Sequence, residues 1–120
     1  MASTSEIIAQ AVERFQQEVS ALSKLKLVFG LELKGRGDTQ LYRVEVPGPK
    51  VSKGYADDER LHLAIPRANF NELAKDGGVS DWRQAYERGQ LRVEGDPQIQ
   101  RLIAQVIERH EARAKLRKAR

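Results

Sequence analysis

Alternation of apolar and polar residues, the pattern of a half-buried strand, occurs in several short stretches of this 120-residue chain. In residues 25–33 every second position is leucine or phenylalanine, and residues 42–46 and 61–65 alternate in the same way. Residues 7–22 and 97–107 instead carry apolar side chains every three or four positions, as amphipathic helices do. Both periods in a chain of this length predict one α+β domain, because a sheet with one apolar face needs helices to cover it.

The first helix is predicted to begin at a capping box, since Ser3 and Glu6 have the required spacing. Its apolar stripe is formed by Ile8, Val12, Phe15, Val19 and Leu22. This spacing predicts a face that is buried against the sheet, and pairing of two chains through the same face is the alternative.

Glycines and prolines predict where the middle elements end. Glycines in residues 35–40 predict a hairpin turn, and the next two prolines limit residues 51–55 to a short or edge strand. Pro66 is predicted to open a helix that the glycine pair at 77–78 ends, and Ser80 is predicted to cap a second short helix.

The stretch GQLRVEGDP, residues 89–97, predicts a strand that leads directly into a helix. Leu91 and Val93 alternate with charged residues, while Asp96 and Pro97 supply the N-cap and the first residue of the helix. The apolar face of this last helix is expected to consist of Ile99, Leu102, Ile103, Val106 and Ile107.

The composition excludes several classes of protein. The absence of cysteine excludes disulfides and thiolate metal sites. The N-terminus lacks the pattern of a secretory signal, and no apolar run is long enough to span a membrane, so we expect a cytoplasmic protein. The net charge of +4 is uneven, because six Lys or Arg and one Glu in residues 109–120 give +5 there and leave −1 elsewhere.

This basic C-terminal tail is expected to be a solvated helix end whose cations suit the helix dipole. If the tail binds a partner, an anionic membrane surface is the alternative that we keep, since clusters of four to eight basic residues can be recognised by phospholipid head groups. Nucleic acid is disfavoured, because cations and aromatic residues are not spread over the rest of the domain.

No motif for catalysis or metal binding is found. The GRGDTQ stretch, residues 35–40, precedes a strand instead of a helix, which argues against a phosphate-binding loop. His62 and His110 lie in different elements without metal-ligand spacing, and acidic residues 57–59 are expected to be a solvated loop. We therefore expect no enzymatic activity, no cofactor and no bound metal ion.

The informative constellation is apolar and aromatic, and from its spacing alone it predicts an ordinary filled core. The sequence LHLAIPRANFNELAKDGGVSDWRQAYERGQLRVEGDPQIQRLI, residues 61–103, however resembles the sterol carrier protein 2 family. The features that carry this resemblance are Phe70, Leu73, Ala85, Gly89, Leu91, Val93, Gly95 and Asp96. It implies a single α+β domain over residues 1–120, with about five mainly antiparallel strands covered on one face by helices.

The resemblance also implies a function, which is non-covalent binding of a fatty acyl chain, sterol or isoprenoid-like lipid in a tunnel between helices and sheet. The side chains that it implies as the lining are Phe70, Leu73, Trp82, Tyr86, Leu102 and Val106, with Phe15 and Val19 at the opposite wall. The alternative is a module of the same fold that binds another protein or a second copy of itself, with a filled core and no lipid.

Overall fold

The computed structural model describes the backbone of residues 3–118 and the side chains of residues 3–116. The elements follow in the order α1 (Thr4–Glu18), the 3-10 helix η1 (Ser20–Lys24), β1 (Leu27–Lys34), β2 (Thr39–Val46), β3 (Lys50–Lys53), β4 (Leu61–Pro66), α2 (Arg67–Asp76), α3 (Val79–Glu87), β5 (Arg92–Gly95) and α4 (Pro97–Lys118). Apart from η1, this order is the one that the sequence predicts.

The five strands form one sheet in the order β3-β2-β1-β4-β5. Only β1 and β4 pair in parallel, and the other three pairs are antiparallel. The predicted fold class, a mainly antiparallel sheet of about five strands, is therefore confirmed. The short strands β3 and β5 lie at the two edges, where few unpaired backbone groups are left exposed.

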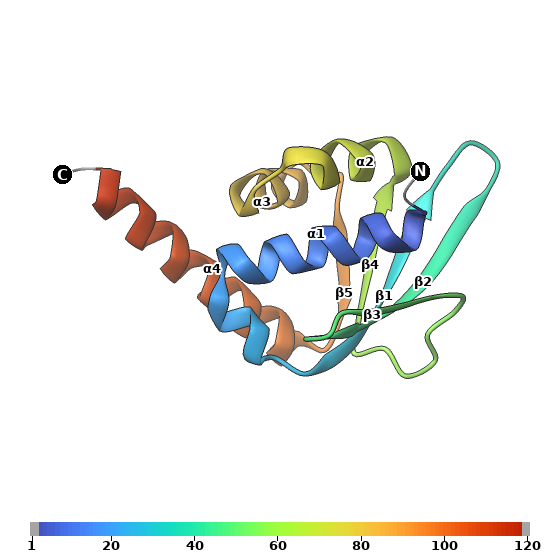
Figure 1. The fold of residues 1–120 in the computed structure, drawn as a ribbon, viewed down its shortest axis with the longest axis horizontal. Helices are drawn as coiled ribbons and strands as arrows, with labels where there is room; N and C mark the ends of the chain where they lie inside the picture. Colours follow the sequence, from blue (N-terminus) through green and yellow to red (C-terminus); the bar gives the residue numbers. More distant parts are fainter. Residues whose placement is uncertain (1–2, 119–120) are drawn as a thin grey trace.

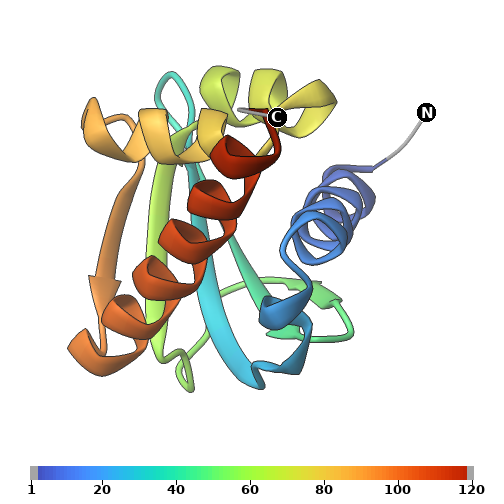
Figure 2. The same cartoon turned by 90° about the vertical axis from the view of Figure 1, so that its left-hand side faces the viewer.

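The helices lie on one face of the sheet (Figures 1 and 2). Alternation along each strand points one set of side chains toward these helices and the other set away from them. Leu31 of β1 pairs with Tyr42 of β2 and with Leu63 of β4 on the helix side. Glu32 and His62 are among the side chains on the outer side, which is charged.

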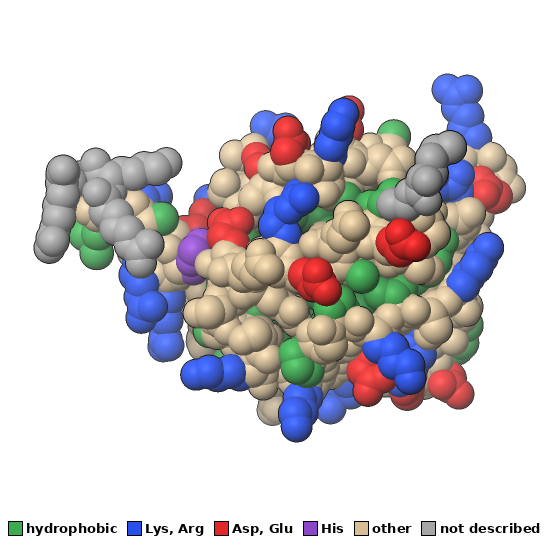
Figure 3. Space-filling model, viewed as in Figure 1, with side chains coloured by type: hydrophobic (Ala, Val, Ile, Leu, Met, Phe, Trp, Pro, Cys, Tyr) green, Lys and Arg blue, Asp and Glu red, His purple; other side chains and the backbone are tan. Residues whose placement is uncertain are grey.

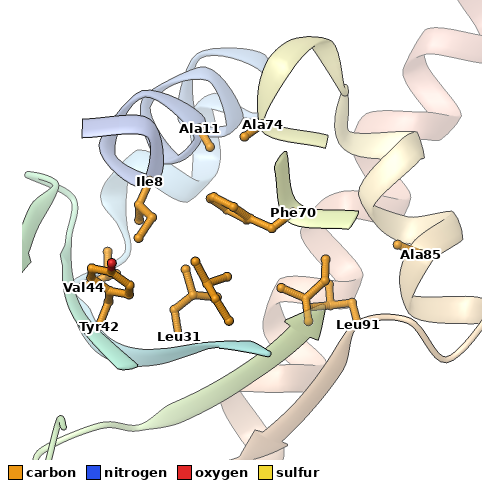
Figure 4. Close-up of a cluster of buried hydrophobic side chains, with 11 residues drawn as sticks. Ile8, Ala11, Leu31, Tyr42, Val44, Phe70, Ala74, Ala85 and Leu91 are labelled. Carbon is orange, nitrogen blue, oxygen red and sulfur yellow. The ribbon is translucent and has the colours of Figure 1, made fainter. Parts of the chain in front are cut away.

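The buried core joins α1, α2 and α3 to the central strands (Figure 4). Ile8 of α1 and Phe70 of α2 pack over Leu33, Val44 and Ile65, all of which are buried. Each such side chain stabilises the fold by about 1.5 to 3 kcal/mol relative to an exposed one. No side chain of α4 is part of this buried cluster among the described residues.

Helix α1 is shorter than predicted, and the continuous stripe from Ile8 to Leu22 is wrong at its end. The helix stops at Glu18, where Val19 adopts φ −118° and ψ 84°, and η1 follows. The hydroxyl of Ser23 donates a hydrogen bond to the carbonyl oxygen of Ser20 at 2.6 Å. Serines compete for backbone hydrogen bonds in this way, which favours a tighter turn over a continued α-helix.

The predicted N-cap of α3 is also wrong, because Ser80 lies one residue inside the helix. Gly78 is the N-cap, and its N–H donates to the carboxylate of Asp81 at 2.9 Å. The next N–H, of Val79, donates to the carboxylate of Glu18 at 3.1 Å. Glu18 is far away in sequence, so only the tertiary structure reveals this cap.

The transition from β5 to α4 forms as predicted. Gly95 has φ +126°, and a Cβ there would overlap the carbonyl oxygen of Arg60. Asp96 then caps α4, accepting the Gln98 N–H at 2.9 Å, and pairs with Arg60 at 2.7 Å. The hydrogen bond from Arg60 lowers the pKa of Asp96 below its ordinary value.

On the outer face, His62 lies between two carboxylates. Its Nδ1 is 3.0 Å from Oε2 of Glu59, and its Nε2 is 3.0 Å from Oε1 of Glu32. The carboxylate of Glu59 occupies the space beside Gly30 that any Cβ would overlap. Burial lowers the pKa of His62, but the hydrogen bonds with Glu59 and Glu32 outweigh it, so the pKa is raised overall.

The acidic residues 57–59 are therefore only in part the solvated loop that the sequence predicts. Asp57 and Asp58 are both exposed, but Asp58 pairs with Arg43 at 2.7 Å, and Glu59, which is half-buried, pairs with His62. These two contacts fasten the connection between β3 and β4 to the outer face of the sheet.

We expect Gly95→Ala to lower the free energy of unfolding by about 1 to 3 kcal/mol, because the backbone conformation and the overlap with Arg60 both disfavour a side chain. Gly54→Ala is the matched control, since Gly54 has the same φ of +126° but open space around it. Chemical denaturation of both variants measures the difference. Equal losses would show that the overlap with Arg60 contributes nothing.

We expect the stabilisation by His62 to depend on pH. Its pKa is raised in the folded state, so the contribution is fully present below the unfolded-state pKa of about 6.5 and is lost as pH rises through the folded-state pKa. The free energy of unfolding should therefore exceed that of His62→Gln by more at about pH 5.5 than at about pH 8.5. This pH dependence of the stabilisation by His62 should be weaker in a Glu59→Gln background. A difference between wild type and His62→Gln that grows as pH rises would contradict a raised pKa of His62 in the folded state.

Candidate functional site

Helix α4 is attached to the rest of the molecule differently from the other helices. In the view of Figure 2 it passes in front of β4 and β1, and Figure 1 shows that it leads away from the sheet, so that its C-terminal end extends beyond the other elements. None of its side chains up to residue 116 is buried. Ile103, Val106 and Ile107 on its inner side are only half-buried. The strands β1, β4 and β5 also carry apolar side chains that are only partly buried against the core, namely Phe29, Leu63 and Val93.

Polar contacts tie α4 in place along its length. Arg83 of α3 pairs with Glu111 at 3.0 Å, and Nε2 of His110 lies 3.4 Å from Oε2 of Glu18 at the end of α1. Together with the Arg60–Asp96 pair at its start, these contacts fix the direction of the helix. Exposed ion pairs stabilise by only about 0 to 1 kcal/mol each, so these contacts hold α4 weakly.

The six side chains implied as a lipid lining lie in three different environments. Phe70 is 2% exposed and packs edge to face against Trp82, with ring centroids 6.1 Å apart. Leu73 and Trp82 are partly buried against the core cluster. Tyr86 and Leu102 are 52% and 45% exposed.

Val106 is the sixth of these side chains, and it lines a cleft of about 270 Å³ between α4 and the junction of α1 with η1. Val19, which was expected at the opposite wall, lines the same cleft and is 3% exposed. Phe15, the other residue expected there, is half-buried and is not part of the cleft lining. The structure thus brings Val19 and Val106 together, while Phe70, Leu73 and Trp82 share the core.

The cleft combines apolar side chains and the carboxylate of Glu18 with two arginines, Arg109 and Arg113, which we call its cationic rim. Its lining consists of Glu18, Val19, Ser20, Ala21, Val106, Arg109, His110, Arg113 and Ala114. The α4 members are spaced three and four residues apart, which places them on one side of the helix. Within residues 3–116, no carboxylate forms an ion pair with Arg109 or Arg113. This arrangement can accommodate an anionic group beside apolar carbon atoms.

Arg109, His110, Arg113 and Glu18 are not among the residues that the sequence predicts for this site. The helical spacing of Val106, Arg109, His110 and Arg113 was a signal that these residues share one side of α4. The position of Glu18 and Ser20 opposite that side had no signal in the sequence, because it depends on how α1 ends.

A second cleft, of about 160 Å³, lies on the outer face of the sheet and is lined by Glu32, Lys34, His62, Ala64, Arg92 and Glu94. Its charges are of both signs and its only apolar lining residue is Ala64, so it does not suit an apolar ligand. Among the residues that the structure describes, no three His, Cys, Asp or Glu side chains are placed to hold a metal ion. Within the same range, none of the helices combines the length and apolar character needed to cross a bilayer.

Comparison with known proteins finds no matching family model and no matching curated protein. Solved structures do match. Palmitated SCP2L2 from Aedes aegypti superimposes with a TM-score of 0.58 at 19% identity, over 83% of this chain and 93% of that one. Apo sterol carrier protein 2 from Yarrowia lipolytica gives a TM-score of 0.55 at 20% identity, over 78% and 87%.

The UbiJ-SCP2 ubiquinone synthesis protein gives a TM-score of 0.50 at 17% identity, over 86% of this chain and 90% of that one. The sec-alkylsulfatase Pisa1 from a Pseudomonas species matches over 89% of this chain but only 16% of its own, at 7% identity and a TM-score of 0.56. The similarity to sterol carrier protein 2 structures that the sequence indicates is thus confirmed at the level of architecture. The chain has the SCP2-like α+β fold.

Proposed function

We propose that this chain is a non-enzymatic lipid-binding module that holds one apolar chain between α4 and the helix-covered face of the sheet. The observation that carries the proposal is the incomplete packing of α4. Its apolar side chains Ile103, Val106 and Ile107 are only half-buried, and the apolar side chains Phe29, Leu63 and Val93 of the sheet are likewise only partly buried. An apolar ligand inserted there would gain about 25 cal/mol for each Å² of apolar surface removed from water.

The structural comparisons support a lipid as the ligand. The similar Aedes aegypti structure is a palmitated protein, and a further sterol carrier protein 2 from the same species was solved in complex with palmitate. The ubiquinone synthesis protein of the same fold extends the candidate ligands to isoprenoid-like molecules. We propose that Phe70, Leu73, Trp82, Tyr86, Leu102 and Val106 line the ligand once α4 has moved outward.

The arrangement of the six residues is consistent with such a movement. Phe70, Leu73 and Trp82 belong to the packed layer of α2 and α3, whereas Leu102 and Val106 belong to α4. A ligand between these two groups would contact both, and Tyr86 and Leu102 would become less exposed. Outward movement of α4 removes no side chain from the buried core, because no described α4 side chain is part of it, but a ligand that contacts Phe70 also has to displace side chains that now cover this ring.

The runner-up is a module of the same fold that binds another protein or a second copy of itself. The burial of Phe70 to 2% exposure favours it, since a filled core leaves no preformed tunnel around this side chain. Exposed Leu102 and Leu116 on α4 would then contribute to the interface. The two proposals differ in which side of α4 binds the partner. The lipid would bind the inner side, and a protein would bind the exposed side.

Trp82 is the only tryptophan and provides a reporter for the lipid proposal. We expect a bromine-labelled palmitate to quench its fluorescence with a stoichiometry of one per chain, verified by native mass spectrometry. Leu73→Phe and Val106→Phe should weaken binding at least about threefold, because the added atoms occupy the proposed path of the chain. Leu116→Phe is the matched control, since Leu116 is 68% exposed and lies outside the proposed lining.

The absence of both quenching and bound mass would reject the lipid proposal. Concentration-dependent dimerisation in the same samples would favour the runner-up. Equal binding by all three variants would instead place the ligand elsewhere on the protein. Circular dichroism and thermal unfolding of each variant show whether it is folded before binding is compared.

A further inference from the structure

We propose that the cleft between α4 and the α1–η1 junction binds the anionic head group of a single-chain lipid, which makes an acidic amphiphile the preferred cargo. This inference rests on the proposed function, because it assigns the polar end of the same ligand. The groups that would hold the head group are the guanidinium groups of Arg109 and Arg113.

Arg109 and Arg113 are one helical turn apart on α4, and both line the cleft. Guanidinium groups bind carboxylate or phosphate oxygens through paired, charge-assisted hydrogen bonds, which are about twice as strong as neutral ones. Lys and Arg side chains are visible along the protruding part of α4 in Figure 3. Two arginines at this spacing can therefore approach one anion from the same side of the cleft.

The carboxylates near the cleft are already engaged. Glu111, on the same helix, pairs with Arg83 of α3 at 3.0 Å. Glu18, at the cleft wall, accepts the Val79 N–H at 3.1 Å and lies 3.4 Å from His110. Since no described carboxylate pairs with Arg109 or Arg113 up to residue 116, the cationic rim is available to a ligand.

The apolar part of the cleft lining matches the carbon atoms next to a head group. Val19, Ala21, Val106 and Ala114 supply its apolar surface. The volume of about 270 Å³ lies just below the range of about 300 to 1,000 Å³ typical of complete small-molecule pockets. The cleft therefore suits a head group together with the first carbon atoms of the lipid tail. The rest of the tail has to extend out of the cleft.

The position of Val106 indicates the direction in which the lipid tail would continue. Val106 lines the cleft, and Leu102 lies one helical turn earlier on α4, toward the sheet end of the helix. A lipid tail that runs along this side of α4, from Arg113 past Val106 to Leu102, enters the proposed lipid site beneath the helix. The head-group cleft and the apolar site are thus the two ends of one path.

The test compares palmitate with hexadecanol, which has the same chain without the charge, at about pH 8 and with both delivered from cyclodextrin. We expect the wild-type protein to bind palmitate on the order of tenfold more tightly than hexadecanol, since hydrogen bonds to charged groups are worth about 1.5 to 3 kcal/mol. The double variant Arg109→Gln/Arg113→Gln should lose this preference and still bind hexadecanol. The control Arg101→Gln/Lys115→Gln removes two cations from α4 that lie outside the cleft, and it should keep the preference for palmitate.

Each other outcome has a defined meaning. Equal affinity of the wild type for both ligands, or a preference that survives in the Arg109/Arg113 variant, overturns the head-group site and leaves lipid binding standing. Binding of neither ligand overturns the proposed function and this inference together. The final comparison uses inorganic phosphate at about 10 mM, with the NMR chemical shifts of the Ser20 and Ala21 amides as the readout. Shifts with phosphate but not with palmitate would assign the cleft to a free anion and overturn its assignment to a lipid head group.

Discussion

The contact between α1, α2 and the apolar face of β1, β2 and β4 is the interaction on which the rest of the structure depends. Ile8 and Phe70 exclude water from Leu31, Val44 and Ile65, and together these elements supply most of the buried core. Because this contact is complete without α4, the last helix is free to serve another purpose. It is held by half-buried apolar side chains and by polar contacts at its surface, which are individually weak.

This division between a tightly packed core and a loosely held helix accounts for how the fold could take up a ligand. A tunnel that stayed open in water would expose apolar surface at a cost, whereas a closed core with one movable cover avoids that cost. The half-buried state of Val106 and of its α4 neighbours is what such a cover requires. Elements that move on binding are generally those with few buried contacts.

Most of the fold could be predicted from the sequence, because alternation, helical spacing, proline and glycine act locally. The start of α4 at Asp96 and Pro97 is an example, since the cap and the first residue of the helix are neighbours in the chain. The end of α1 and the cap of α3 could not be predicted. They meet at Glu18, whose contact with the Val79 N–H exists only after the helices pack.

The candidate site divides in the same way. Resemblance could indicate Phe70 and Val106 by position along the chain, but not that the first is buried in the core while the second lines a cleft. From the sequence, Arg109 and Arg113 are predicted to belong to a basic tail of residues 109–120. In the structure this segment up to Lys118 belongs to α4, residues 119 and 120 lie outside the described part, and Arg109 and Arg113 face the end of α1.

Amide hydrogen exchange with and without palmitate is the most direct test of the central claim, that α4 is a movable cover over a permanent core. The account predicts that amides in residues 101–110 exchange faster than those of β1 and β4 in the free protein, and that palmitate slows them by at least about tenfold while the strands change little. Exchange of α4 as slow as that of the strands, and unchanged by palmitate, would contradict it.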